Sequence, residues 1–151
     1  MSIPDPAQWS REGFIVTCDP RRVDRTFVAG FLQASYWAQG IPADTVNRSI
    51  DGSLCFALLT AGRQIGFARV ISDRATIAYL GDVFITPEFR GRGLGKWLME
   101  CVLSHPQLQG LRRWILVTRD AHGLYRQLGF KALGRPEGFM ELHRPDVYGA
   151  T

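Results

Sequence analysis

The spacing of apolar residues predicts an alternation of strands and helices along the chain. Residues 13–19 are typical of a short first strand. Residues 23–40 repeat apolar side chains at helical spacing and end at a glycine, and residues 42–50 predict a second, shorter helix. Two β-rich runs within residues 53–73, separated by a short turn that contains glycine, predict a hairpin.

The second half of the chain extends this pattern. Further strands are predicted at residues 75–86, 112–118, 130–133 and 138–143, and further helices at residues 91–104 and 121–129. The first of these strands is apolar on both faces, as expected in the centre of a sheet. The order β-α-α-β-β-β-α-β-α-β-β therefore indicates an α/β or α+β fold, in which helices pack against a mixed sheet.

Size and composition fit a single globular domain over residues 1–151, with 46% hydrophobic and 21% charged residues. No apolar run is long enough to span a bilayer, and the N-terminus has no secretion-signal pattern. Cys18, Cys55 and Cys101 are widely spaced, which indicates reduced thiols in a cytoplasmic protein rather than disulfides or a zinc site. No group of histidines and carboxylates has metal-ligand spacing.

Residues 90–96 place three glycines and three cations between a predicted strand and a predicted helix. An apolar stripe sets the start of that helix among the glycines; it consists of Leu94, Trp97, Leu98, Cys101 and Val102. A helix start exposes backbone N–H groups and carries partial positive charge, and glycine lets a ligand approach the backbone closely. Such a turn is suited to phosphate groups.

The spacing of the glycines excludes two common phosphate-binding motifs. In a P-loop, Gly-Lys is followed by Ser or Thr, whereas Trp97 follows Gly95-Lys96 here. The dinucleotide fingerprint G-x-G-x-x-G is absent as well, because the three glycines, Gly91, Gly93 and Gly95, stand at every second position. The pattern present is R-x-x-G-x-G, over residues 90–95.

This segment resembles motif A of the GNAT superfamily, the acyl-CoA-dependent N-acyltransferases. Residues 121–130, AHGLYRQLGF, resemble that family's A-x-x-L-Y-x-x-x-G-F signature. The two motifs stand in the family's order, and the order of elements also matches. The resemblance implies a mostly antiparallel sheet flanked by helices, acetyl-CoA as co-substrate, no metal, and an amine acceptor on a small molecule or peptide.

The same resemblance implies a set of cofactor contacts. Backbone N–H groups would hold the CoA pyrophosphate along Arg90, Gly91, Arg92, Gly93, Leu94, Gly95 and Lys96. The main chain of Val83 and Ile85 would pair with the pantetheine arm. Thr118 stands where the family often has an asparagine that helps bind the cofactor, and a threonine can still hydrogen-bond.

For chemistry, the resemblance marks Tyr125 as the general acid that serves the departing thiolate. Its position on a helical apolar stripe is equally typical of core packing. By the same resemblance, some members of the family use a glutamate or histidine on the strand before motif A as the base. The corresponding positions here are Tyr79 and Gly81, and neither is a carboxylate. Strict alternation puts these two with Val83 and Ile85 on one face, unless a bulge intervenes. Asp82 would then face the other way, with Leu80 and Phe84, and a buried hydrogen-bonding role is favoured over a role as base through a water.

On the acceptor side, Tyr36 and Trp37 stand beside a Gly-x-Pro loop. They form either an aromatic wall for the substrate or a cover for the core. The predicted C-terminal edge strand can support a homodimer.

Direct attack of the amine in a ternary complex is favoured over an acyl-enzyme, because no cysteine has an activating neighbour in the sequence. A CoA-binding sensor or interaction module without turnover is the alternative. A nucleic-acid binder ranks last, because only the net charge of +4 and the pI of about 9.3 support it.

Overall fold

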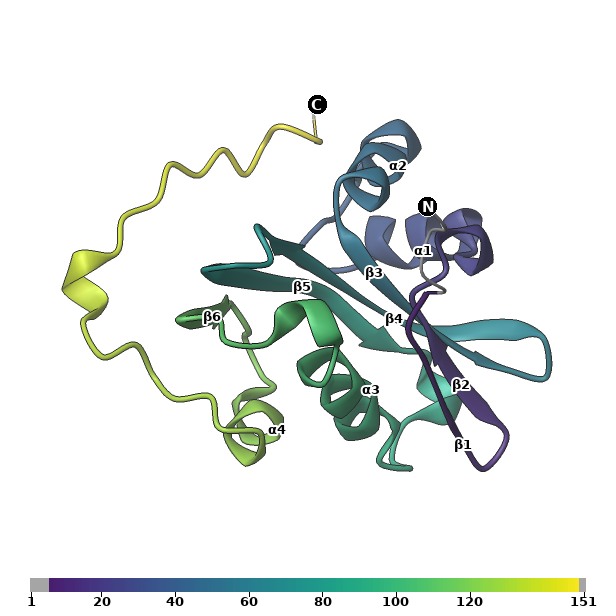
Figure 1. The fold of residues 1–151 in the computed structure, drawn as a ribbon. Coiled ribbons are helices and arrows are strands. Elements are labelled where there is room, and N and C mark those ends of the chain that lie inside the picture. The colour runs from purple at the N-terminus through teal and green to yellow at the C-terminus, as the bar shows by residue number, and fades with distance from the viewer. Residues whose placement is uncertain (1–5, 150–151) are drawn as a thin grey trace, which may run out of the picture.

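The computed structural model describes residues 6–149 as a six-stranded sheet with helices on both faces (Figure 1). The strands are β1 (Gln8–Arg11), β2 (Phe14–Thr17), β3 (Leu54–Thr60), β4 (Arg63–Ser72), β5 (Ile77–Ile85) and β6 (Arg113–Leu116). The helices are α1 (Arg25–Gln33), α2 (Ala43–Asp51), α3 (Leu94–Leu103) and α4 (His122–Gln127). Short 3-10 turns are η1 (Pro20–Arg22), η2 (Pro87–Phe89), η3 (Pro106–Leu108) and η4 (Pro136–Gly138).

The strands lie in the sheet in the order in which they occur in the chain. Every pair from β1 to β5 is antiparallel, whereas β6 runs parallel to its neighbour β5. A parallel pair needs a crossover, and α3 supplies it between β5 and β6. The predicted class, a mostly antiparallel mixed sheet flanked by helices, is confirmed.

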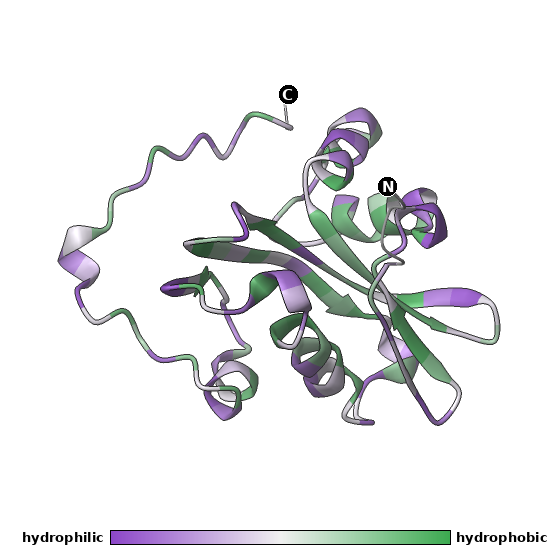
Figure 2. Cartoon of the chain, viewed as in Figure 1, coloured by the Kyte–Doolittle hydropathy of each residue, from purple (hydrophilic) through white to green (hydrophobic). Residues whose placement is uncertain are grey.

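Two apolar cores hold the helices to the sheet. On one face α1 and α2 bury Val28, Leu32, Val46 and Ile50 with Phe67 and Phe84 of the sheet. On the other face α3 and α4 bury Leu94, Leu98, Met99, Val102 and Tyr125 with Phe56, Val70 and Leu80. Figure 2 shows the strands between these layers as largely hydrophobic. Their burial is the main force that fixes the layers.

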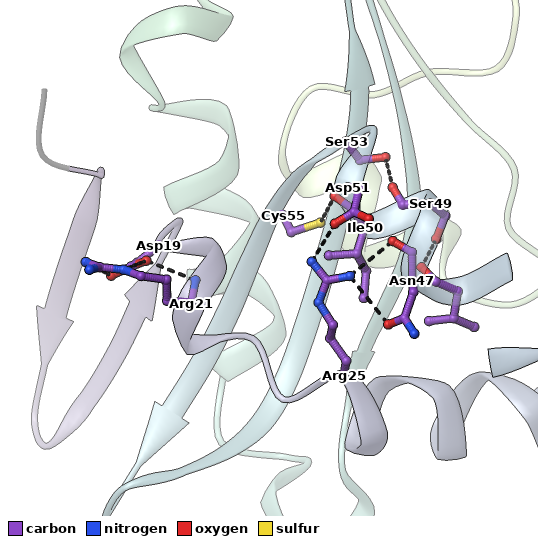
Figure 3. A network of polar contacts seen from close by, with 10 residues as sticks. Asp19, Arg21, Arg25, Asn47, Ser49, Ile50, Asp51, Ser53 and Cys55 are labelled. Carbon is purple, nitrogen blue, oxygen red and sulfur yellow. Dashed lines mark hydrogen bonds and ion pairs between the residues drawn. The ribbon is translucent and has the colours of Figure 1, made fainter. Parts of the chain in front are cut away.

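A polar network ties α1 to α2 and to the start of β3 (Figure 3). The Arg25 guanidinium donates to the Asp51 carboxylate at 2.7 Å and to the Asn47 carbonyl oxygen at 3.1 Å. The Ser53 hydroxyl donates to the Ser49 carbonyl at 2.7 Å. These bonds reach across the ends of both helices, so they fix the orientation of the helix pair that precedes β3.

The structure contains one strand that the sequence did not predict. β1 pairs with β2 through a two-residue turn, Glu12-Gly13, at which both residues have positive φ, 50° and 85°. Two positive φ values in a two-residue hairpin loop are typical of a type I′ turn. The four residues of β1 are mostly exposed and alternate weakly, so the apolar pattern did not mark them.

The first helix is shorter than the predicted range of 23–40, because α1 ends at Gln33. The Ser35 hydroxyl donates to the Leu32 carbonyl at 2.7 Å and accepts the Ala38 N–H at 3.1 Å. A serine that bonds the backbone in this way competes with the helical ladder. The early end turns Tyr36 and Trp37 out of the helix and onto the surface.

The two closing strands predicted at residues 130–133 and 138–143 are wrong. Within residues 6–149 neither segment pairs with another strand. A β-strand needs a hydrogen-bonding neighbour, and the chain after Gly129 instead runs in a wide loop outside the sheet (yellow-green to yellow in Figure 1). We call residues 130–149 the C-terminal arm. Among the described helices none is long and apolar enough to cross a membrane.

Candidate active site

The candidate site lies where β5 and β6 part. The two strands pair from Ile77 opposite Arg113 to Leu80 opposite Leu116, and the pairing stops there. From Gly81 to Ile85, the strand neighbour of β5 among the described residues lies only on its β4 side. The main chain of this segment therefore offers unpaired N–H and C=O groups along the opening between the strands.

A β-bulge changes the faces of β5 within this segment. Phe67 lies opposite Phe84 and Arg69 opposite Gly81, so that Asp82 and Val83 together face Ala68. Asp82 is the bulged residue and has a φ of 53°, in the left-handed region.

The bulge overturns two expectations based on strict alternation. Leu80 packs with α3 and α4, on the same face as Val83 and Ile85, and not with Phe84, which belongs to the opposite core. Tyr79 is not on the face of Val83 and Ile85, because it alternates with the buried Leu80. Its ring stays 38% exposed beside Gly81.

The bulge points the Asp82 carboxylate at a side-chain network. One oxygen accepts from the Trp37 indole Nε1–H at 2.8 Å, and the other accepts from the Arg69 guanidinium Nε–H at 2.8 Å. Arg69 also donates to the Ser53 hydroxyl at 3.0 Å. The two charged side chains are 10% and 17% exposed, so the pair is largely desolvated. With both oxygens engaged, Asp82 has the geometry of a residue that holds Trp37 in place.

The glycine turn follows β5 through η2. Gly91 and Gly93 have φ values of 79° and 75°, and a Cβ at either position would meet nothing within 4 Å. Gly93 is the N-cap of α3 and supplies no side-chain cap. The first N–H groups of α3 therefore have no side-chain cap, and the glycines before them leave room for a ligand, which is the arrangement that binds phosphate at a helix start.

The three cations of the turn have different surroundings. The Arg90 guanidinium donates to the Ile85 carbonyl at 2.9 Å, so this side chain braces the turn against the end of β5. The Arg92 guanidinium lies 5.0 Å from the centre of the Phe89 ring. Lys96 is exposed on the first turn of α3. Arg92 and Lys96 are thus the side chains best placed to supply charge to a bound anion.

Tyr125 reaches the same region from α4. The start of α3, the end of β5 and α4 converge at Gly95, whose Cβ position would lie 3.9 Å from Ile85 and 4.0 Å from Leu124. Tyr125 is 8% exposed and packs against the Phe130 ring at 5.7 Å between centroids. Burial, with a smaller contribution from Tyr36, raises the pKa of the Tyr125 phenol to about 12. The phenol therefore stays protonated at every working pH.

Thr118 lies at the start of the same helix. Its hydroxyl oxygen accepts the Ala121 N–H at 3.1 Å, and so fixes the turn that leads into α4. The hydroxyl hydrogen remains available to donate to another acceptor. A cofactor contact by Thr118 stays a prediction.

Tyr36 and Trp37 span the opening between the parted strands. Trp37 is held by Asp82 of β5, while the Tyr36 hydroxyl accepts the Arg119 N–H, at 3.3 Å, from the loop that follows β6. The Arg119 guanidinium stacks on the Tyr36 ring, 3.7 Å from its centre. The two aromatic rings meet edge to face at 5.2 Å. Both stay substantially exposed, at 50% and 41%, which fits a wall more than a cover of the core.

None of the three cysteines has the surroundings of a nucleophile, although Cys55 lies opposite Arg69 on the neighbouring strand. Cys55 and Cys101 are buried and Cys18 is half-buried, and burial raises the pKa of each thiol to about 12. A thiol with such a pKa carries almost no thiolate at neutral pH and is a poor nucleophile. Within the described residues no group of three metal-ligating side chains comes together.

Comparison with known proteins agrees with this geometry. Residues 51–132 match the model of the acetyltransferase (GNAT) domain family. A protein of Gibberella zeae named as an acetyltransferase is 32% identical over 155 residues, covering 87% of this chain and 86% of its own. Two further relatives are named N-acetyltransferases. The match covers about half of the length of each, 52% and 56%.

Solved structures show the same relationship. A GNAT-family protein of Xanthomonas campestris has 48% identity and a TM-score of 0.89, covering 93% of this chain and 99% of its own. An acetyltransferase structure from Deinococcus radiodurans has 25% identity and a TM-score of 0.71, covering 91% and 94%. The chain belongs to the GNAT family of acetyltransferases, and it is an enzyme of that class.

Sequence reasoning missed two residues of the site. Arg69 stands in an apolar strand, IGFARVIS, and a charged residue in such a strand is rarely buried without a partner. This signal could have identified the ion pair with Asp82 but was not used. Arg119 carries no such signal, because its stacking on Tyr36 depends on two loops that lie 83 residues apart in the chain.

Proposed function

We propose that this enzyme transfers the acetyl group of acetyl-CoA to a primary amine of a small molecule or peptide, by direct attack in a ternary complex. The supporting observation is the order of two features along the chain. Segment 81–85 of β5 has no strand neighbour on its β6 side within residues 6–149, and it is followed through η2 and the glycine turn by the start of α3, which has no side-chain cap. The main chain of Val83 and Ile85 would pair with the pantetheine amides, and N–H groups from Arg90 to Lys96 would hold the pyrophosphate.

In this reaction the amine nitrogen attacks the thioester carbonyl carbon and forms the new C–N bond. Collapse of the tetrahedral intermediate breaks the C–S bond and expels the CoA thiolate, while the nitrogen releases its proton to solvent water. Tyr125 is the proposed acid. Because its pKa is about 12 and a reference thiol has a pKa of about 8.5, complete proton transfer to the thiolate is uphill by roughly 5 kcal/mol. Tyr125 therefore acts as a hydrogen-bond donor to the sulfur as negative charge develops on it.

The acceptor would approach along the aromatic wall of Tyr36 and Trp37, which closes the end of the opening opposite the glycine turn. A primary amine with a pKa near ~10.4 is mostly protonated at neutral pH, and only its free base attacks. Since both Asp82 oxygens are engaged, we propose that the acceptor binds as the free amine and that kcat/KM rises with pH toward the pKa of the amine. The three free thiols fit a reducing, cytoplasmic location, which we also propose.

The test compares two glycine substitutions. Gly93→Asp places a carboxylate where the pyrophosphate would lie. Gly110→Asp is its matched control: Gly110 has nearly the same φ, 74°, and equally open surroundings, but lies outside the glycine turn. Both variants carry the same added charge and similar backbone strain, so only the ligand contact distinguishes them.

Acetyl-CoA affinity is measured by calorimetry and turnover by thiol release with a panel of amines. We expect Gly93→Asp to weaken acetyl-CoA binding by at least ~10²-fold, the loss of more than about 2.7 kcal/mol, and Gly110→Asp to leave it nearly unchanged. Equal affinity in the two variants contradicts the proposed pyrophosphate site. Tight binding by the wild type with no thiol released on any amine contradicts transfer to an amine and favours a binding module.

A further inference from the structure

The aromatic wall of Tyr36 and Trp37 carries a cation whose hydrogen-bonding capacity is mostly unused. The Arg119 guanidinium stacks on the Tyr36 ring, 3.7 Å from its centre, and the arginine side chain is 64% exposed. A guanidinium that stacks on a ring keeps its N–H groups in its own plane, where they can still bond an anion. Within residues 6–149 neither Nε nor Nη1 of Arg119 has a hydrogen-bond partner.

The contact between Arg119 and Asp120 leaves this cation available. The Arg119 Nη2 donates to the Asp120 carboxylate at 3.4 Å, which is long for a hydrogen bond, and both side chains are largely exposed. An exposed ion pair contributes little free energy, because water screens both charges and the side chains lose freedom when they pair. A ligand can therefore bind the guanidinium beside Asp120, or in its place, at little cost.

Two contacts with one tyrosine hold Arg119 at the site. Its backbone N–H donates to the Tyr36 hydroxyl at 3.3 Å, while its guanidinium covers the ring of the same residue. A side chain that is already held loses less freedom when it binds a ligand. Tyr36 also contributes to the raised pKa of the Tyr125 phenol, so the two phenols lie within electrostatic range of each other. Arg119 therefore stands beside the proposed reaction centre.

The charges at the wall favour an acceptor with one negative charge. Both oxygens of the Asp82 carboxylate are engaged, by Trp37 and by Arg69, and Asp120 already faces Arg119. A second ammonium group on the acceptor would meet the guanidinium as a like charge. A carboxylate carries the single negative charge that balances one guanidinium, and its two oxygens match the spacing of the guanidinium N–H groups.

The two rings provide a place for an apolar group. Tyr36 and Trp37 lie 5.2 Å apart between centroids, with 81° between their planes, and both remain partly exposed. Nearly perpendicular rings form a corner against which an aliphatic or aromatic group can pack. The wall thus presents a corner for an apolar group beside a cation for a carboxylate.

We propose that the acceptor is an amino acid in the broad sense, an amine that also carries a carboxylate and an apolar side chain. Its carboxylate binds the Arg119 guanidinium, and its side chain packs against Tyr36 and Trp37. This inference rests on the proposed acetyl transfer and specifies the acceptor. The carboxylate takes no part in bond making; it positions the amine nitrogen, which forms the C–N bond as the C–S bond breaks. The products are the N-acetylated acid and CoA.

The test measures thiol release from acetyl-CoA with matched amines. Phenylalanine carries its carboxylate next to the amine, and para-carboxyphenethylamine carries it at the far end of the ring. The neutral amide of each compound keeps the shape and removes the charge, and tyramine with tyramine phosphate tests a phosphate in place of the carboxylate. Rates are compared at equal concentrations of the free amine, because the carboxylate changes the pKa of its neighbour.

Two arginine variants are compared with the wild type. Arg119→Gln removes the proposed contact. Arg48→Gln is the matched control, because Arg48 is 72% exposed and pairs with Asp44 at 3.4 Å on α2, outside the aromatic wall. For each amine the kcat/KM of the variant is divided by that of the wild type, so that the pKa of the amine cancels.

We expect the wild type to prefer at least one of the two acids to its amide. For that acid Arg119→Gln should lower kcat/KM by about 10- to 10²-fold, mainly through KM, and for the amide by less than about threefold. Arg48→Gln should change neither value.

Three results overturn the proposal. The first is an equal loss for acid and amide in Arg119→Gln, which would show that Arg119 only supports Tyr36. The second is a wild type that turns over the amides as well as the acids, and the third is a preference for tyramine phosphate over both acids. Each of these leaves acetyl transfer to an amine intact, whereas thiol release with none of the amines contradicts the proposed function itself.

Discussion

Substitutions at Asp82 and Trp37 test whether this carboxylate positions the acceptor wall or acts as the catalytic base. Asp82→Ala removes both hydrogen bonds of the carboxylate and leaves the largely buried Arg69 with only its bond to Ser53. Trp37→Phe keeps a ring but removes the indole donor. Asp82→Asn keeps the shape of the side chain and one acceptor oxygen while removing the charge.

The structure sets the expected size of each effect. Loss of one partner from a largely desolvated ion pair lowers the free energy of unfolding by about 3 kcal/mol, the low end of the range for buried pairs. Loss of the indole hydrogen bond to a carboxylate costs about 1.5 kcal/mol, since Trp37 is partly exposed. In the double variant the free energy of unfolding should fall by about 3 kcal/mol rather than by the sum of the two single effects. The reason is that Asp82→Ala already removes the hydrogen bond that Trp37→Phe deletes.

The assay combines urea unfolding of the four proteins of this cycle with steady-state kinetics of Asp82→Asn and Trp37→Phe. Both variants should raise KM for the amine by about 3- to 10-fold and leave kcat within about threefold, as expected for lost ground-state binding. The dependence of kcat/KM on pH should keep its shape in Asp82→Asn.

Two results would refute this reasoning. Additive effects on unfolding, with a coupling below about 0.5 kcal/mol, would show that Trp37 and Asp82 do not act together. A fall in kcat of ~10² or more in Asp82→Asn, with loss of the acidic limb of the pH profile, would identify Asp82 as the base.

Two further predictions concern Tyr125. Tyr125→Phe should slow thiol release by about 10²-fold while leaving the affinity for acetyl-CoA nearly unchanged, and equal turnover in the variant would reduce the residue to packing. The native state keeps the phenol proton up to about pH 12, whereas the unfolded chain releases it near pH 10, so the free energy of unfolding should fall as pH rises from 10 to 12. Urea unfolding should show that the free energy of unfolding falls less between pH 8 and pH 11 in Tyr125→Phe than in the wild type. An equal fall in both proteins would contradict the raised pKa of Tyr125.

The parts of the site that depend on local spacing were predictable from the sequence. The apolar stripe of α3 located the helix start among the glycines, and α3 does begin at Leu94 with Gly93 as its cap. The end of α4 was equally visible, since Gly129 has a φ of 98° directly after the C-cap. In these places the nearest neighbours in the chain decide the conformation.

The parts that depend on distant neighbours were not predictable. The bulge at Asp82 arises from the register between β4 and β5, and it moves Leu80 and Val83 onto one face against the two-residue period. The early end of α1 follows from hydrogen bonds of Ser35, which has no unusual propensity. The C-terminal arm has a strand pattern, but within residues 6–149 no strand pairs with it. An alternating pattern marks which face of a strand would be buried, but it does not supply the neighbouring strand.

The most direct test of the account is a crystal structure of the enzyme with acetyl-CoA. We expect the pyrophosphate against the N–H groups of residues 90–96, the pantetheine amides paired with the main chain of residues 81–85, and the sulfur within hydrogen-bonding distance of the Tyr125 hydroxyl. Acetyl-CoA bound elsewhere, with the glycine turn and the opening between β5 and β6 unoccupied, would contradict the assignment of the site and the mechanism built on it.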